Sequence, residues 1–204
     1  MTTPRELPLA GQPVRVRRDA VANADRILCA ARRVVDRDGV ENLTMDRLAA
    51  EAGVGKGTVF RAFGNRAGLF AALTDDSERQ FQQAHLSGPP PLGPGAPPLE
   101  RLLAYGAGRL RLVGVQGSLI LAQVPAAKFD VPARKVSAMH IRMLLRQCGV
   151  EDNVDVCTEA LLGALDPDLV RYLATERGLS DAELRAGWQA LARAVVGTGG
   201  VSES

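Results

Sequence analysis

The sequence predicts an all-α fold, in which a small N-terminal domain with a helix-turn-helix precedes a larger helical domain. Hydrophobic residues form 46% of the chain and aromatic residues only 4%, while alanine and leucine, which favour helices, are plentiful. Apolar residues recur at helical spacing along most of the chain. Two short helical segments also meet at a tight turn, Ala52-Gly53-Val54, as in a helix-turn-helix.

The first 18 residues are predicted to be a flexible arm, because they contain three prolines and a glycine. A basic run that includes Arg17 and Arg18 ends this arm. Two interpretations remain open: the arm is a solvated tail, or its arginines contact a polyanion beside the next domain.

Residues 19–64 are expected to form three helices and the first domain. The first helix covers residues 19–38, where apolar side chains follow one stripe and a glycine supplies the end. The hydroxyl of Thr44 can cap the second helix. Gly53 permits the positive φ that a sharp turn requires, and Gly55 starts the third helix.

A fourth helix is expected over residues 65–86, with Asn65 as its cap, and it links the two domains. The next segment, residues 87–98, holds six of the 12 prolines of the chain. Such a segment is neither helix nor strand, so we expect a stiffened loop there.

Helical spacing returns over residues 99–197, which we expect to form the second domain before a short tail at residues 198–204. A kink is expected at Asp166-Pro167, because proline cannot donate a helical hydrogen bond. The predicted helices of this domain cover residues 99–112, 118–124, 132–149, 153–175 and 181–196.

Charge is unevenly distributed along the chain. The net charge is +2, but residues 1–70 carry +4 and residues 71–204 carry −2. No acidic residue lies between Ala52 and Thr74, whereas three basic residues do. A basic, acid-free second helix in a helix pair is what a DNA reader needs in the major groove.

Individual roles follow from chemistry. Thr44 lies at a helix N-terminus and can bind a phosphate, Arg61 can pair with guanine, and Gly57 allows the backbone to approach DNA. Val59 is more typical of packing than of reading. The predicted DNA-contacting residues are Arg17, Arg18, Thr44, Lys56, Gly57, Thr58, Val59, Phe60, Arg61 and Arg66.

The run AGVGKGTVFRAFGNRAGLF resembles the DNA-binding domain of the TetR family of bacterial transcriptional regulators, and the similarity covers about residues 20–73. The resemblance implies a homodimer that binds a double-stranded, palindromic operator, most often as a repressor. It also implies that a small molecule in the larger domain tilts the fourth helix and releases the operator.

Two positions depart from the family pattern. Most relatives carry Ser at the position of Gly55 and Tyr at the position of Phe60, and a phenylalanine cannot donate a hydrogen bond to phosphate. An alternative therefore stays open: a helical ligand-binding or dimerisation protein that has lost DNA binding.

The second domain offers candidate residues for an effector pocket and a dimer interface. An apolar cavity between helices suits a small molecule, and two long apolar stripes suit a four-helix bundle, although the stripes could equally pack inside one protomer. The predicted pocket residues are Leu103, Leu110, Gln116, Leu121, Gln123, His140, Met143, Leu144 and Gln147. The predicted interface residues are Leu161, Leu162, Leu165, Leu169, Tyr172, Leu184, Trp188, Leu191 and Val195.

Other classes of protein are disfavoured. The sequence shows no nucleophile elbow, phosphate loop or metal motif, so we expect neither an enzyme nor a cofactor. No apolar run is long enough for a membrane span, which favours the cytoplasm. Cys29, Cys148 and Cys157 are expected to be small buried apolar residues, with a Cys148–Cys157 redox pair as the alternative.

Overall fold

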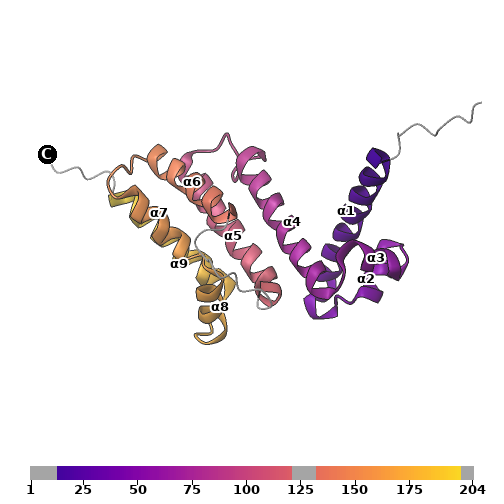
Figure 1. The fold of residues 1–204 in the computed structure, drawn as a ribbon. Coiled ribbons are helices and arrows are strands. Elements are labelled where there is room, and N and C mark those ends of the chain that lie inside the picture. Colours follow the sequence, from indigo (N-terminus) through magenta and orange to yellow (C-terminus); the bar gives the residue numbers. More distant parts are fainter. Residues whose placement is uncertain (1–12, 121–131, 199–204) are drawn as a thin grey trace, which may run out of the picture. The chain divides into compact units, whose positions relative to one another are not determined.

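The computed structural model describes residues 13–120 and 132–198, which form nine α-helices and one 3₁₀ turn without any strand (Figure 1). The predicted all-α class is confirmed. The chain divides into two compact units, residues 1–73 and residues 74–204. One continuous helix, α4 (Arg66–Ser87), contains the division between them.

The first unit is a small helical domain with one apolar core. Ile27, Leu48, Val59 and Leu69 come from four different helices and have no exposed surface. Removal of such side chains from water stabilises the unit by roughly 1.5–3 kcal/mol each. Its elements are α1 (Pro13–Asp38), η1 (Val40–Asn42), α2 (Met45–Ala52), α3 (Lys56–Phe63) and the first turns of α4.

Local signals set the helix ends of this unit, as the sequence predicts. The Thr44 hydroxyl oxygen accepts a hydrogen bond from the backbone N–H of Arg47 at 3.2 Å and caps α2. Gly53 ends α2 in the left-handed conformation, with φ of 64°. Gly55 is the N-cap of α3, and the Asn65 side chain accepts from the N–H of Gly68 at the start of α4.

The start of α1 differs from the prediction. The helix begins at Pro13, before the predicted Asp19, so the last part of the expected arm is helical. Proline is favourable at the first position of a helix, since its fixed φ suits the helix and its missing N–H would be unpaired there anyway. Residues 1–12 of the predicted arm lie outside the described residues.

The second unit consists of helices that pack together around a second apolar core (Figure 1). Trp188 packs so closely on Gly106 that a Cβ there would lie 2.2 Å from the indole ring. Its indole N–H donates to the Leu161 carbonyl at 3.2 Å. The elements after α4 are α5 (Pro98–Ile120), α6 (Pro132–Gln147), α7 (Val154–Gly163), α8 (Pro167–Thr175) and α9 (Asp181–Thr198).

Two predicted helix boundaries in the second unit are wrong. α5 runs unbroken to Ile120, where a break after Leu112 is predicted, because single glycines cost a helix only about 1 kcal/mol each. The predicted helix over residues 153–175 is two helices rather than one kinked helix. The Asp166 side chain caps α8 by accepting from the N–H of Asp168 at 2.9 Å, and Pro167 begins it.

The cysteine prediction is partly wrong. Cys29 is exposed, because it lies on the side of α1 away from the core, while Cys148 and Cys157 are half-buried. All three thiols are free. Burial raises the pKa of the Cys148 thiol, which disfavours its reactive thiolate form.

Candidate nucleic-acid interface

Helix α3 presents a polar, basic surface on a buried apolar base. Lys56, Gly57, Phe60 and Arg61 are exposed, whereas Val59 has no exposed surface. The predicted contact of Val59 with DNA is therefore wrong, since its side chain is enclosed in the core of the unit. Within the described part of this unit, no element covers the exposed side of α3, so a binding partner can reach it.

Arg61 carries the least constrained charge of α3. Neither an ion pair nor a hydrogen bond holds its guanidinium among the described residues. It borders a hollow between α1 and α3, which Thr58 and Arg26 also line. A guanidinium held only by its own helix can form a bidentate pair with a guanine edge.

Lys56 is not free, contrary to the simplest form of the prediction. Its Nζ lies 2.7 Å from the Asp46 carboxylate, which projects from the first turn of α2. Both side chains are more than half exposed, at 57% and 70%. Such a pair contributes at most about 1 kcal/mol, so a DNA phosphate can replace Asp46 as the partner.

Thr44 and Arg66 lie at helix N-termini near the exposed side of the unit. The Thr44 oxygen already accepts from Arg47, which leaves its hydroxyl proton available for a phosphate oxygen. The Arg66 guanidinium lies 4.8 Å from the centre of the Phe70 ring, and its Nη2 donates to the Val40 carbonyl at 3.5 Å. The hydrogen bond is long and Arg66 is exposed, so its guanidinium remains available to a ligand.

Gly57 leaves the surface of α3 open. A Cβ at this position would meet no atom within 4 Å, and Gly57 is exposed. The backbone of α3 can therefore approach a partner more closely here than at a residue with a side chain. The other two predicted contacts, Arg17 and Arg18, fall in α1, and their side chains lie outside the described part.

The residues predicted to line an effector pocket are dispersed in the second unit. Leu144 and His140 are buried, Leu103 is half-buried, and Met143 and Gln147 are exposed. A cavity of about 370 Å³ lies between α5, α8 and α9, and Leu110 is the predicted residue that lines it. The Gln116 side chain, Leu121 and Gln123 lie outside the described part.

His140 belongs to a buried polar cluster that sequence spacing did not reveal. Its ring centre lies 4.4 Å from that of His85 on α4 and 5.4 Å from that of Tyr105 on α5. Burial, together with smaller effects of the charges of His85 and Arg101, lowers the pKa of His140 to about 4. Burial also lowers the pKa of His85 and raises that of Tyr105, so all three groups are neutral at pH 7.

The predicted dimer stripes separate into a buried part and an exposed part. Leu161, Leu162, Leu165 and Trp188 lie in the core of their own protomer, so they are not available to a partner. Leu184 and Val195 are half-buried. The exposed members of the predicted stripes are Leu169 at 40%, Tyr172 at 45% and Leu191 at 38%.

A model of the family described as "Bacterial regulatory proteins, tetR family" matches residues 27–73. The matched residues contain η1, α2, α3 and the first turns of α4. Over these residues, the chain is similar to the DNA-binding domain of the TetR family. The expected resemblance is confirmed for the part of the chain that presents the basic surface of α3.

Curated relatives match over a similar length. An HTH-type transcriptional regulator of Staphylococcus aureus strain bovine RF122 / ET3-1 is 43% identical over 54 residues, which are 26% of this chain and 29% of that protein. A regulator of the same description from strain USA300 matches at the same identity and length. The match thus spans less than a third of these relatives.

Solved structures share the fold over most of the chain. A transcriptional regulator from Rhodococcus sp. Rha1 has a TM-score of 0.58 at 17% identity, over 86% of this chain and 96% of that one. A TetR-like regulator from Rhodococcus sp. RHA1 has a TM-score of 0.55 at 22% identity, over 96% and 100%. The Streptomyces coelicolor TetR family protein ActR, in complex with (S)-DNPA, has a TM-score of 0.51 at 19% identity, over 87% and 98%.

The described residues lack the features of two other kinds of site. None of their helices is both long and apolar enough to cross a membrane. Within the same residues, no group of three or more His, Cys, Asp or Glu side chains is arranged to hold a metal ion.

Proposed function

We propose that this chain is a homodimeric, DNA-binding transcriptional regulator, most often a repressor in its family, whose operator is released by a small-molecule effector in the second unit. The observation that carries the proposal is the surface of α3, where exposed Lys56, Gly57 and Arg61 stand on a buried apolar base. A rigid helix with cationic side chains on its free side fits the major groove.

In this proposal, different residues contact the phosphates and the bases of the DNA. Thr44, Lys56 and Arg66 bind phosphates, which supply most of the affinity without sequence information. Arg61 and Thr58 contact base edges and supply sequence preference. Phe60 lacks the hydroxyl that relatives use on a phosphate, and the nearby Lys56, 6.0 Å from the Phe60 ring centre, offers the replacement charge.

The proposed dimer joins the exposed apolar residues of α8 and α9. Leu169, Tyr172 and Leu191 are large, apolar or amphipathic, and exposed in the single chain. Two copies of α3 about one DNA turn apart then bind two half-sites, which multiplies the affinity of a domain too small to bind tightly alone. A two-fold dimer calls for a palindromic operator.

Effector release is supported by the fold. ActR, which shares the fold of both units, was solved with the small molecule (S)-DNPA bound. The second unit of this chain also has a cavity of about 370 Å³, which is partly open to solvent. Any true effector must bind the DNA-free form more tightly than the DNA-bound form, since equal affinity would shift nothing.

The test is a gel-shift assay with the DNA upstream of the chain's own coding region, repeated across a salt series. We expect saturable, sequence-preferring binding that weakens steeply between roughly 50 and 200 mM salt. Arg61→Glu should abolish the preference, because it places a carboxylate against the base edges. Arg146→Glu, a change at another exposed arginine, on α6, is the control and should bind as the wild type does.

One alternative has observations of its own. Gly55, Phe60 and the Lys56–Asp46 ion pair each reduce the polar anchoring of α3, which would suit a ligand-binding or dimerisation protein without DNA binding. The same assay decides between the two proposals. Equal, weak binding of wild type and Arg61→Glu to every DNA sequence would favour this alternative.

A further inference from the structure

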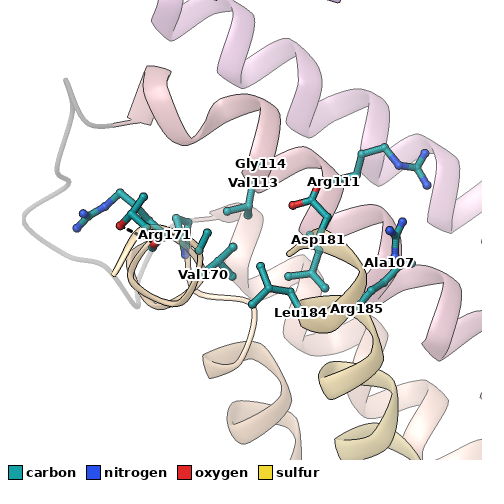
Figure 2. A pocket seen from close by; sticks show the side chains of 13 residues that line it. Ala107, Arg111, Val113, Gly114, Val170, Arg171, Asp181, Leu184 and Arg185 are labelled. Atoms are coloured by element: carbon teal, nitrogen blue, oxygen red, sulfur yellow. Dashed lines mark hydrogen bonds between the residues drawn. The ribbon is translucent and has the colours of Figure 1, made fainter. Parts of the chain in front are cut away.

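A cavity that plays no part in the proposed DNA contacts lies between α5, α8 and α9 (Figure 2). Its volume is about 370 Å³, which suits a small organic molecule. Leu110 and Val113 of α5, Val170 of α8 and Leu184 of α9 give it an apolar lining. An apolar part of a ligand is therefore favoured in its interior.

Positive charge surrounds this apolar lining. Arg111, Arg171 and Arg185 line the cavity together with a single carboxylate, Asp181. Figure 2 shows the guanidinium groups of Arg111 and Arg185 on one side and that of Arg171 on the other. Across the described ranges, none of these three arginines has an acidic partner. The cavity thus offers unpaired guanidinium groups to an anion.

The cavity does not compete with the proposed dimer surface. On α8 its lining residues, which include Val170, Arg171 and Ala174, follow helical spacing along one side. The exposed Leu169 and Tyr172 fall on the opposite side of the same helix. A ligand and a partner subunit can therefore contact α8 at the same time.

Helix α5 connects the cavity with α4. Leu110 and Arg111 line the cavity, while Arg109, on the other side of α5, pairs with Glu78 of α4. The Arg109 and Glu78 side chains are only 21% and 15% exposed, so this ion pair is well shielded from water. A ligand that displaces α5 consequently acts on the helix that continues into the first unit.

We propose that this cavity is the effector site and that it takes a small amphipathic organic anion, with the acid group on Arg111 and Arg185 and an apolar body on Leu110, Val113, Val170 and Leu184. Only the expected effect of the ligand on DNA binding rests on the proposed regulator function. The proposed binding site is inferred from the cavity and from the charges that line it.

The test uses probes that share one tail and differ in the head group: octanoate, octanol and octylammonium, with 2-naphthoate as an aromatic acid. Trp188, the single tryptophan of the chain, lies on α9 three residues after the cavity residue Arg185 and reports binding by fluorescence. We expect both acids to bind saturably to the full chain, and octanol and octylammonium to bind at least about tenfold more weakly.

Variants locate the site. Arg185→Gln should weaken the two acids about tenfold, Arg185→Lys should restore part of the affinity, and Ala107→Phe should block binding by filling the cavity. Arg193→Gln is the matched control, because Arg193 is an exposed arginine on the outer side of the same helix. Circular dichroism of each variant reports whether it remains folded.

Four outcomes separate the two proposals. Arg185-dependent binding of an acid that also releases upstream DNA supports the inference. Failure of both acids, or equal binding of octanol and octylammonium, overturns it even if the chain binds DNA. Acid binding without any change in DNA affinity overturns the regulatory role of the cavity. Acid binding by a chain that binds no DNA leaves the anion site and refutes the proposed function.

Discussion

At the residue scale, several positive charges of the first unit are already paired with its own acids. Glu51 accepts Arg33 at 3.1 Å and Arg37 at 3.2 Å, and these hydrogen bonds hold the pKa of Glu51 below its usual value. Asp38 pairs with Arg47 at 2.6 Å. The charge count of the sequence therefore overstates what is available to DNA, and Arg61 gains in importance.

Gly57→Ala should separate the stability of the unit from its DNA affinity. Alanine favours a helix over glycine by roughly 0.5–1 kcal/mol, and the new methyl meets no protein atom within 4 Å, so the free energy of unfolding should rise. If DNA approaches the α3 backbone here, the same methyl should weaken DNA binding about tenfold. Urea unfolding and fluorescence anisotropy with labelled DNA measure the two effects.

A matched control is available in the second unit. A Cβ at Gly163, the last residue of α7, would also meet no atom within 4 Å, so Gly163→Ala should leave DNA affinity unchanged. Unchanged DNA affinity in Gly57→Ala would contradict close approach of DNA to α3.

Predictions for single residues were correct where the residue acts on nearby backbone groups. They were incomplete where the residue interacts with a different helix. Thr44, Gly53 and Asn65 act on backbone groups within a few residues, so the sequence alone identifies them. The ion pair between Lys56 and Asp46 joins two helices across a turn. Its geometry depends on how those helices pack, which residue spacing does not determine.

At the element scale, three helices of the second unit meet at a buried polar junction. His85 of α4, Tyr105 of α5 and His140 of α6 have ring centres 4.4–5.4 Å apart. Glu78, Arg101 and Arg109 supply the nearby charges. Both nitrogens of His140 are buried without a hydrogen-bond partner within the described part, which makes a proton there costly.

The junction predicts a loss of stability on mild acidification. Since the pKa of His140 is near 4 in the folded chain and near 6.5 when unfolded, the unfolded chain takes up the proton first as the pH falls. The contribution of His140 to stability is fully present well above pH 6.5 and decreases down to about pH 4, by about 1–2 kcal/mol between pH 6.5 and pH 5. His140→Gln should reduce this dependence in urea-unfolding experiments, and parallel curves for the two proteins would exclude the explanation.

The element boundaries show the same division between local and distant causes. The sequence located α6 and α9 at Pro132 and Asp181, where a proline and a capping residue act nearby. It did not show that α5 continues to Ile120, because glycines that look like a break cost a helix only about 1 kcal/mol each. The sequence also did not predict the cavity between α5, α8 and α9, because its residues lie far apart in sequence.

At the scale of the whole molecule, two compact units share one continuous helix, and the proposed function needs both. Residues 27–73 of the first unit match the family model, whereas the second unit is similar to solved structures in fold alone. The sequence pattern thus identified the first domain. It did not show which residues of the predicted dimer stripes are exposed, because that depends on which ones the core buries.

The proposed dimer predicts that Leu169→Glu combined with Tyr172→Glu yields a monomer. The two new carboxylates would have to be buried in the dimer interface without partners, which destabilises it. Leu169 and Tyr172 are exposed, so their replacement should leave the core of the protomer intact. Size-exclusion chromatography with light scattering measures the mass, and operator affinity should fall with it. Met139→Glu, a change at an exposed residue of α6, should remain dimeric; a dimeric double variant would refute the interface.

The most direct test of the central claim, that α3 reads DNA through Arg61, compares Arg61→Ala with Arg66→Ala on specific and scrambled DNA. For each protein, fluorescence anisotropy gives the ratio of the two dissociation constants. We predict that Arg61→Ala reduces this ratio by about 1–3 kcal/mol in free-energy terms, whereas Arg66→Ala weakens both DNAs alike. An unchanged ratio in Arg61→Ala would contradict the claim.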